Sequence, residues 1–249
     1  LLGGGLNLIS EANGTIAFKH KYNGLKQYPL YGLYMEVRTM TEDNDGRIWV
    51  GTMDGLMSFD GHFTNPEEIQ FETYRQVSER SNVADNDIYV LYKDSESQIW
   101  VSVFGGGLNK LVRYDKERRV PVFKSYGIRE GMNNDVVKSI VEDKDGNLWF
   151  TTEIGLSCFN KDTEQFRNYD RYDGFLNVEL EESSALRTLS GDLWLGSRQG
   201  ILTFSPNKLE TQNMNYDTRI VDFKISNRDL RSFHEDPVLK ESITFADAI

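Results

Sequence analysis

The four tryptophans of the chain stand in four copies of one motif, and this repeat limits the possible fold more than any other feature. Trp49, Trp100, Trp149 and Trp194 follow one another at intervals of about 50 residues, which fit one four-stranded propeller blade each. The copies read EDNDGRIWVGTMDGLMSFD (42–60), KDSESQIWVSVFGGGLNKL (93–111), EDKDGNLWFTTEIGLSCFN (142–160) and LSGDLWLGSRQGILTFS (189–205).

A fifth, partial copy lies at the start of the chain. The segment GGGLN at 3–7 matches GGGLN at 105–109, which indicates that the chain begins inside a blade. The predicted fold class is therefore all-β. We expect part of a β-propeller, with about four blades of four antiparallel strands and a partial N-terminal blade.

The third copy shows where the strands of one blade should lie. Strands are predicted at 136–142, 147–152, 155–160 and 165–170, with a tight turn between the first two. Leu148, Trp149 and Phe150 do not alternate with polar residues, which is typical of a strand covered on both faces. We therefore expect the tryptophans to be core residues between stacked blades.

The acidic segments EDNDGRIW and EDKDGNLW could hold a metal or turn the chain. An EF-hand loop with Gly46 at its sixth position would need glutamate at its twelfth, where Thr52 stands. An Asp-Gly pair between apolar runs needs only a hairpin. We therefore predict turns, with no metal, no cofactor and no effect of calcium on the melting temperature. Solvated turn carboxylates are expected at Asp43, Asp45, Asp143 and Asp145.

Charge and composition exclude some classes of function. The net charge of −11 and the pI of about 4.8 oppose contact with nucleic acid or an anionic membrane. No apolar run is long enough for a transmembrane helix, and no signal peptide is expected in this segment. Cys158 is the single cysteine and is predicted to be a strand side chain rather than a nucleophile. The three histidines do not have metal-ligand spacing.

The repeat pattern changes after Pro206, and a domain boundary is predicted at about residue 210. Residues 1–209 form the propeller part, and residues 210–249 form a linker and the start of another domain. RIVDFKISNRDL (219–230) and ESITFADAI (241–249) read as the first strands of an Ig-like β-sandwich.

These segments resemble a known family. The acidic turn, Gly-Asn-Leu-Trp and the Gly-Leu corner resemble the two-component regulator propeller repeat, and residues 173–209 resemble the last repeat of such a propeller. IVDFKISNRDL resembles the opening of the small sandwich called the Y_Y_Y domain. The second repeat departs from the pattern, because Ser97 stands where the turn glycine is expected.

The resemblance implies a role in sensing. Proteins with this domain order are mostly hybrid two-component sensors of polysaccharide-degrading gut bacteria, with periplasmic propellers and a kinase inside the inner membrane. It implies that this segment is not an enzyme, binds an oligosaccharide and works in a homodimer that regulates polysaccharide-utilisation genes. Two alternatives stay open: a propeller enzyme acting on glycans, either a glycoside hydrolase or a lyase, and a protein-interaction scaffold. Binding without turnover would favour the sensor.

Propeller geometry indicates where a ligand would bind. The loops between blades share one face with the turns between second and third strands, opposite the acidic turns. This face should collect the loops 78–87, 127–135 and 175–182. Amides, carboxylates, arginines and an aromatic ring are the groups that would hold a sugar there. The candidate ligand-binding residues are Phe104, Arg129, Asn133, Asn134, Glu153 and Arg198.

Overall fold

The computed structural model describes residues 4–12, 14–75, 86–169, 173, 178–209, 224–225 and 228–229. The chain divides into two compact units, Leu1–Leu209 and Glu210–Ile249. In the second unit the described part is one short antiparallel pair, β18 (Lys224–Ile225) and β19 (Arg228–Asp229). The predicted sandwich strand at 241–249, and parts of the predicted loops 78–87 and 175–182, lie outside the described residues.

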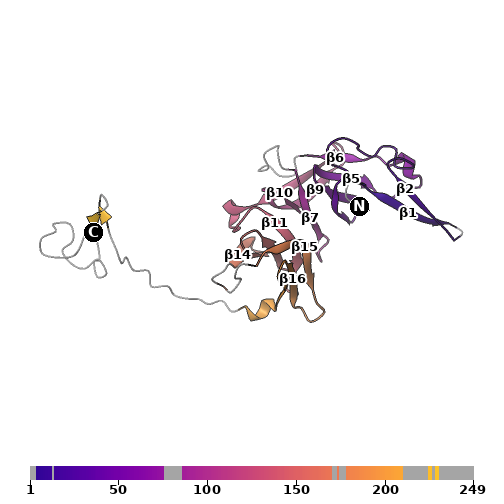
Figure 1. Ribbon diagram of the computed structural model, residues 1–249. Helices are drawn as coiled ribbons and strands as arrows, with labels where there is room; N and C mark the ends of the chain where they lie inside the picture. The colour runs from indigo at the N-terminus through magenta and orange to yellow at the C-terminus, as the bar shows by residue number, and fades with distance from the viewer. Residues whose placement is uncertain are drawn as a thin grey trace, which may run out of the picture. The chain divides into compact units, whose positions relative to one another are not determined.

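Antiparallel sheets in chain order build the first unit, which confirms the predicted all-β propeller fold (Figure 1). A two-stranded sheet comes first, formed by β1 (Asn7–Ala12) and β2 (Thr15–His20). Blade 1 contains β3 (Val37–Glu42), β4 (Arg47–Thr52), β5 (Gly55–Asp60) and β6 (Glu72–Tyr74). Blade 2 contains β7 (Ile88–Lys93), β8 (Ile99–Val103), β9 (Gly107–Asp115) and β10 (Val120–Tyr126).

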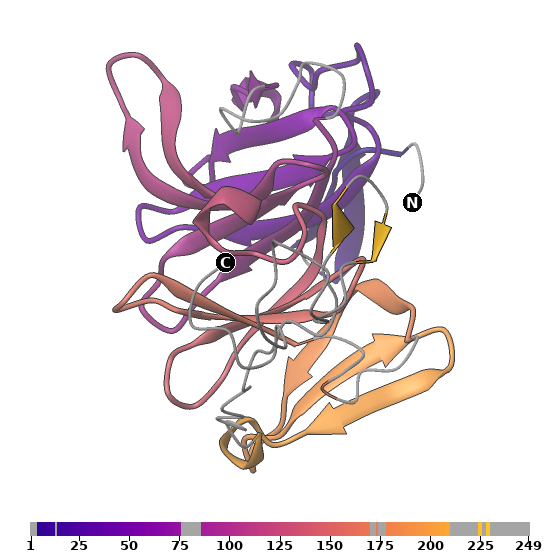
Figure 2. The same cartoon turned by 90° about the vertical axis from the view of Figure 1, so that its left-hand side faces the viewer.

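Two further blades follow. Blade 3 contains β11 (Val137–Glu142), β12 (Leu148–Thr152), β13 (Leu156–Asn160) and β14 (Gln165–Tyr169), so its four predicted strands are confirmed. Blade 4 has three described strands, β15 (Leu180–Arg187), β16 (Leu193–Ser197) and β17 (Gly200–Phe204), drawn in orange in Figure 2. The short 3₁₀ turns are η1 (Pro66–Glu68), η2 (Ile128–Glu130) and η4 (Pro206–Lys208).

The first strand of each blade is the innermost. β3 contacts β7, β7 contacts β11, β11 contacts β15, and β15 also reaches β7. Successive first strands therefore surround a common axis, and the later strands of each blade lie further out.

Three of the four tryptophans form the core between blades. Each lies on the second strand of its blade and contacts a tyrosine on the fourth strand and an aromatic ring on the third strand of the next blade. The ring-centroid distances are 6.1 Å to Tyr74 and 5.9 Å to Tyr114 for Trp49, 6.1 Å to Tyr126 and 5.7 Å to Phe159 for Trp100, and 5.5 Å to Tyr169 and 5.2 Å to Phe204 for Trp149.

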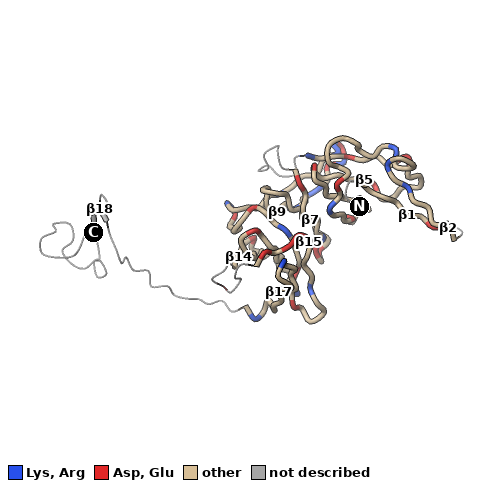
Figure 3. The backbone as a smooth tube through the Cα atoms, in the orientation of Figure 1, with Lys and Arg blue, Asp and Glu red and all other residues tan. Residues whose placement is uncertain are grey.

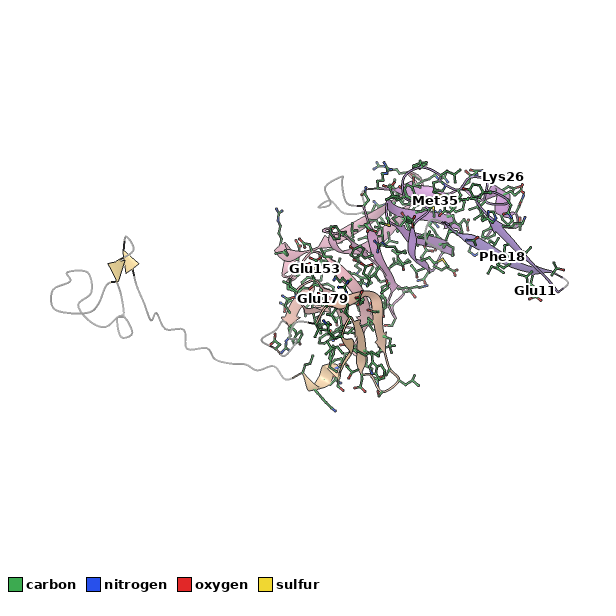
Figure 4. The ribbon with its side chains drawn as sticks, viewed as in Figure 1. Glu11, Phe18, Lys26, Met35, Glu153 and Glu179 are labelled. Atoms are coloured by element: carbon green, nitrogen blue, oxygen red, sulfur yellow. The ribbon has the colours of Figure 1, made fainter. Side chains whose placement is uncertain are left out.

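The prediction that all four tryptophans are buried is wrong for Trp194. Its side chain is 41% exposed, against 1% for Trp49 and Trp100 and 3% for Trp149. The described part of blade 4 ends with its third strand, so neither a fourth-strand tyrosine nor a following blade covers Trp194 there. The opposite end of the unit is also open, because Phe18 on β2 is 57% exposed (Figure 4).

The acidic segments turn the chain as predicted, but the first aspartate of each turn is not a solvated carboxylate. Asp143 is only 3% exposed, and its Oδ1 accepts hydrogen bonds from the backbone N–H groups of Asp145 and Asn147, both at 2.9 Å. Its Oδ2 accepts a bond from Trp149 Nε1 at 2.7 Å. Asp43 makes the same three contacts in blade 1 and Asp94 makes them in blade 2. The first aspartate of each turn therefore fixes both the turn and the tryptophan, whereas Asp45 and Asp145 are exposed as predicted.

The turn of blade 2 keeps its shape without glycine. Gly46 and Gly146 have φ values of 78° and 82°, and Ser97 at the equivalent position has a φ of 67°. Glycine adopts this left-handed region at no steric cost, whereas an L-residue is strained there. The turn bonds around Asp94 hold Ser97 in this conformation, since Ser97 N–H also donates to the Asp94 carbonyl at 2.9 Å.

Candidate functional site

The connections between blades and the turns between second and third strands lie on one face, which we call the loop face. Backbone hydrogen bonds join the two kinds of segment in three blades. The N–H of Met53 donates to Glu36, that of Phe104 to Asp87 and that of Arg198 to Glu179, at 3.1, 2.9 and 3.0 Å. The inner strands begin at this face, next to the axis.

A β-bulge recurs near the start of each inner strand. The pairing with the second strand shifts at Arg38 in β3, at Tyr89 in β7 and at Lys138 in β11. In β15 the shift spans Leu180 to Ala185 and includes Ser183, which has a φ of 51°. A bulge adds an unpaired residue and re-aims its side chain.

The bulged residues contact one another's blades around the axis. Lys138 Nζ donates to the Leu180 carbonyl at 3.3 Å, and Ser183 Oγ donates to the Tyr89 carbonyl at 3.5 Å. We call Arg38, Tyr89, Lys138 and Ser183 the bulge ring. Because the inner strands begin at the loop face, the ring lies at the loop-face end of the axis that these strands surround, and we call this end the mouth.

Arg38 connects three blades in this ring. Its guanidinium donates to Asp87 Oδ2 at 2.7 Å in blade 2 and to Glu182 Oε2 at 2.6 Å in blade 4. The guanidinium carbon also lies 4.8 Å from the centre of the Tyr89 ring, within cation–π distance. The Arg38 side chain is 26% exposed.

Tyr89 and Phe104 extend the arrangement with a pair of aromatic rings. Their centroids are 5.6 Å apart and the rings are tilted by 56°. Burial first, and then the negative charges of Glu182 and Asp87, raise the pKa of the Tyr89 phenol above its ordinary value. The phenol therefore stays protonated at neutral pH and can donate a hydrogen bond. The negative charge of Glu153 also contributes to the raised pKa of this phenol, as the smallest of these causes.

The structure brings some of the predicted residues to this mouth and leaves others further out. Phe104 is half-buried against Tyr89, and Glu153 is exposed at the turn between β12 and β13 (Figure 4). Arg198 is exposed and forms ion pairs with Glu179 at 3.0 Å and Glu181 at 3.3 Å. Arg129 is exposed in η2.

Asn133 and Asn134 hold the loop that enters blade 3. Asn133 Oδ1 accepts hydrogen bonds from the hydroxyls of Thr152 at 3.1 Å and Ser157 at 3.0 Å. Asn134 Oδ1 accepts a bond from the Val136 N–H at 2.7 Å. Both amides therefore stabilise this loop of the loop face through hydrogen bonds.

Sequence reasoning did not select the residues at the centre of the site, Arg38, Tyr89, Asp87 and Glu182. Arg38 and Tyr89 lie on β3 and β7, whereas the predicted site was restricted to loops and turns. One signal was present, since Arg38, Tyr89 and Lys138 each follow an apolar residue that opens the first strand of their repeat. Asp87 and Glu182 are within the loops predicted for this face.

Other kinds of site find little support in the described residues. No group of three or more His, Cys, Asp or Glu side chains is arranged to hold a metal ion there. Burial raises the pKa of the Cys158 thiol to about 12, so Cys158 is not a nucleophile at neutral pH. No described helix is long and apolar enough to cross a membrane.

Comparison with known proteins connects the fold with a family of repeats. The family model of the two component regulator propeller matches residues 32–54 and 131–153, which confirms the resemblance seen in the first and third repeats. The chain is 28% identical over 223 residues to histidine kinase P4 of Formosa agariphila, and the match covers 88% of the chain and 16% of the kinase.

Solved structures have a similar arrangement of sheets. PorZ, a surface component of the type-IX secretion system of Porphyromonas gingivalis, superposes with a TM-score of 0.52 at 19% identity, over 68% of this chain and 26% of PorZ. The extracellular domain of a proposed hybrid two component system from B. thetaiotaomicron matches with a TM-score of 0.41 at 22% identity, over 77% of this chain and 31% of that domain. The chain thus spans less than a third of each of these relatives.

Proposed function

We propose that this chain is part of the ligand-sensing region of a two-component histidine kinase-like sensor, and that its loop face binds an oligosaccharide. The regulator-propeller repeats and the similarity to histidine kinase P4 support the sensor assignment. The sensor would be periplasmic, as the sequence resemblance implies, and would control genes for polysaccharide use. The segment itself would bind its ligand without chemical turnover.

The observation that carries this proposal is the cluster of Arg38, Tyr89 and Phe104 at the mouth. It combines two aromatic rings with a planar guanidinium, flanked by the carboxylates of Asp87 and Glu182. Small-molecule sites have this character, with apolar surface for contact area and a few convergent polar groups for orientation. The ring faces would contact the C–H groups of a sugar, and the charged groups would bind its hydroxyls.

The charge of the chain indicates which saccharides fit. The net charge is −11, and acidic positions are spread along the blades among the basic ones (Figure 3). An anionic glycan would approach against this negative field. We therefore expect a neutral oligosaccharide.

Signalling would depend on how the ligand changes the relation between subunits. A ligand shifts an equilibrium between two arrangements only by its differential affinity for them. We expect the sensor to act as a homodimer, with residues 210–249 providing the covalent connection onward from the propeller. The ligand would favour the dimer arrangement that activates the kinase.

The test is calorimetry on the complete sensor region with a panel of neutral oligosaccharides built from glucose, mannose or xylose. Tyr89→Ala should weaken binding at least ten-fold, because it removes both the ring face and the support of Arg38. Tyr22→Ala is the matched control, since Tyr22 is 78% exposed in the connection before blade 1. Equal affinity of Tyr89→Ala and the parent protein would exclude the bulge ring as the binding site.

The same samples test the alternative of an enzyme. New reducing ends, or unsaturated products of a lyase, should not form during incubation with any saccharide that binds. Product formation by the parent protein would replace the sensor proposal with that of a propeller enzyme.

A further inference from the structure

The face opposite the loop face has clefts between blades. We call it the turn face, because the turns between first and second strands and between third and fourth strands lie there. Two equivalent positions can be compared in each blade interface at this face. The first position is the last residue of the inner strand. The second is counted from the residue of β9, β13 or β17 that pairs with the tryptophan of the same blade, and it comes three residues later in the chain.

The interface between blades 2 and 3 is filled. Its two positions hold Glu142 and Lys161, which pair at 2.8 Å. Lys161 Nζ also lies 3.1 Å from Asp94 Oδ2, and the Lys161 side chain is only 10% exposed. The lysine therefore occupies the space where a cleft would be.

The interface between blades 1 and 2 cannot be filled in this way. The equivalent positions hold Lys93 and Arg113, two like charges, and the Arg113 side chain turns outward with 61% exposure. A cleft of about 510 Å³ lies between the outer part of blade 1 and the β9–β10 hairpin of blade 2, and its volume is within the size range of small-molecule sites. Between blades 3 and 4, Pro206 takes the position of Lys161, and a cleft of about 410 Å³ is present there too.

The larger cleft has a preorganised floor. Glu72, at the start of β6, accepts hydrogen bonds from Tyr114 OH at 2.5 Å, Tyr74 OH at 2.8 Å and Arg47 Nη1 at 2.8 Å. The Arg47 guanidinium lies 4.1 Å from the centre of the Tyr114 ring. With 12% exposure for Glu72 and 19% for Arg47, these side chains are fixed before any ligand arrives.

The walls add polar groups that are not committed to the floor. Asp60 bonds His62 through Oδ1, and among the described residues its Oδ2 has no hydrogen bond to another group. Gln70 is exposed on the same side, and Phe63 provides an apolar surface. Carboxylate, amide and aromatic groups therefore surround one space.

We propose that the cleft between blades 1 and 2 is a second binding site, for a neutral saccharide, separate from the bulge ring. The proposal rests on the proposed function for the class of ligand. Five carboxylates line the cleft against three permanent cations, which disfavours an anionic ligand. The alternation of donors and acceptors beside Phe63 and Tyr114 suits the hydroxyls and C–H faces of a sugar.

The β9–β10 hairpin would act as a cover for this site. It is the longest hairpin of the described blades and extends past the sheets beside it (Figure 2). Lys116 at its tip pairs with Asp45 at 3.1 Å, and both side chains are more than two-thirds exposed. An exposed pair of this kind contributes little to stability, so a ligand can displace it readily.

The experiment uses the complete sensor region and the same neutral gluco-, manno- and xylo-oligosaccharides, with oligogalacturonate as an anionic comparison. Calorimetry should find two sites per chain in the parent protein. The variant Asp60→Ala/Gln70→Ala, which changes two exposed side chains of the cleft, should lose at least ten-fold in affinity at one site only. Glu117→Ala at the exposed hairpin tip is the control and should bind as the parent does.

The outcomes separate this inference from the proposed function. If Tyr89→Ala abolishes one site and Asp60→Ala/Gln70→Ala the other, both are supported. Loss of all binding in Tyr89→Ala, with unchanged binding in the cleft variant, supports the bulge ring and overturns the cleft. Loss of binding only in the cleft variant supports the cleft as a binding site and overturns the bulge ring as one. Tighter binding of oligogalacturonate than of every neutral oligosaccharide would overturn the assigned ligand class.

Discussion

Replacing Asp143 with alanine tests whether the first aspartate of each turn connects the turn to the core. The carboxylate is 3% exposed and accepts bonds from two backbone N–H groups and from Trp149 Nε1. Asp145, two residues further along the same turn, is exposed. Asp145→Ala is therefore a matched control, with the same chemical change in the same turn.

The expected loss of stability in Asp143→Ala follows from the three N–H groups that would lose their hydrogen-bond acceptor. A buried donor left without a partner costs about 1–3 kcal/mol. We assign most of this cost to the indole N–H, because Trp149 is only 3% exposed. The two turn N–H groups are nearer to solvent and can be partly hydrated. We expect Asp143→Ala to lower the free energy of unfolding by about 3 kcal/mol, and Asp145→Ala to change it by no more than about 0.5 kcal/mol.

Urea unfolding followed by tryptophan fluorescence measures both variants, with circular dichroism at equilibrium as a second probe. Equal stability of Asp143→Ala and Asp145→Ala would refute the argument. In that case the turn aspartates would be solvated residues, as the sequence alone predicted, and their bonds to tryptophan would add nothing to stability.

Three further predictions concern the blades. Trp100→Ala should cost about 3–5 kcal/mol as a large core deletion, and Trp194→Ala should cost less than half as much in the same denaturation assay. Ser97→Gly should raise the melting temperature, because it relieves the left-handed strain; an unchanged or lower value would mean that the turn bonds already offset it. Glu72 links pH to stability: burial opposes its ionisation, but hydrogen bonds from Tyr114 and Tyr74 and the charge of Arg47 hold its pKa below the ordinary value of 4.5. Its stabilisation is present above about pH 4.5 and is lost as the pH falls through the lower folded-state pKa, so acid titration of Glu72→Gln should show a smaller loss of stability than the parent.

The fold could be predicted from the sequence because its signals are local. The triplet Leu148-Trp149-Phe150 indicates a strand covered on both faces, and Asp145-Gly146 indicates the turn before it. Both recur at the blade interval, and the structure places the strands within a residue or two of the prediction. The exposure of Trp194 was not predictable in this way, because it depends on the neighbour of the blade rather than on the repeat itself.

The residues at the centre of the candidate site could not be predicted from local sequence patterns, because their positions depend on contacts between segments. Arg38 and Tyr89 stand at the bulges of β3 and β7, and a bulge arises from the pairing of two strands. The burial of Asp143 likewise requires the neighbouring blade that encloses Trp149. Local patterns indicated which residues turn the chain, and only the assembled blades show which carboxylates are buried.

One contact of the bulge ring connects it to the last described blade of the propeller unit. Arg38 bonds Glu182, and Glu182 belongs to β15, the inner strand of the last described blade. From β15 the chain needs only β16, β17 and η4 to reach Leu209, where the unit ends. A ligand that draws Arg38 away from Glu182 would remove a contact between blade 1 and blade 4 without touching the tryptophan core. The loss would act on the blade that leads directly to residues 210–249, while the interfaces around Trp49, Trp100 and Trp149 keep the remaining blades in place. If the bulge ring binds the proposed ligand, the change of this one polar contact would affect the blade from which the chain continues to residue 210, whereas a ligand at the rim of blade 1 or 2 would have to move a packed blade interface.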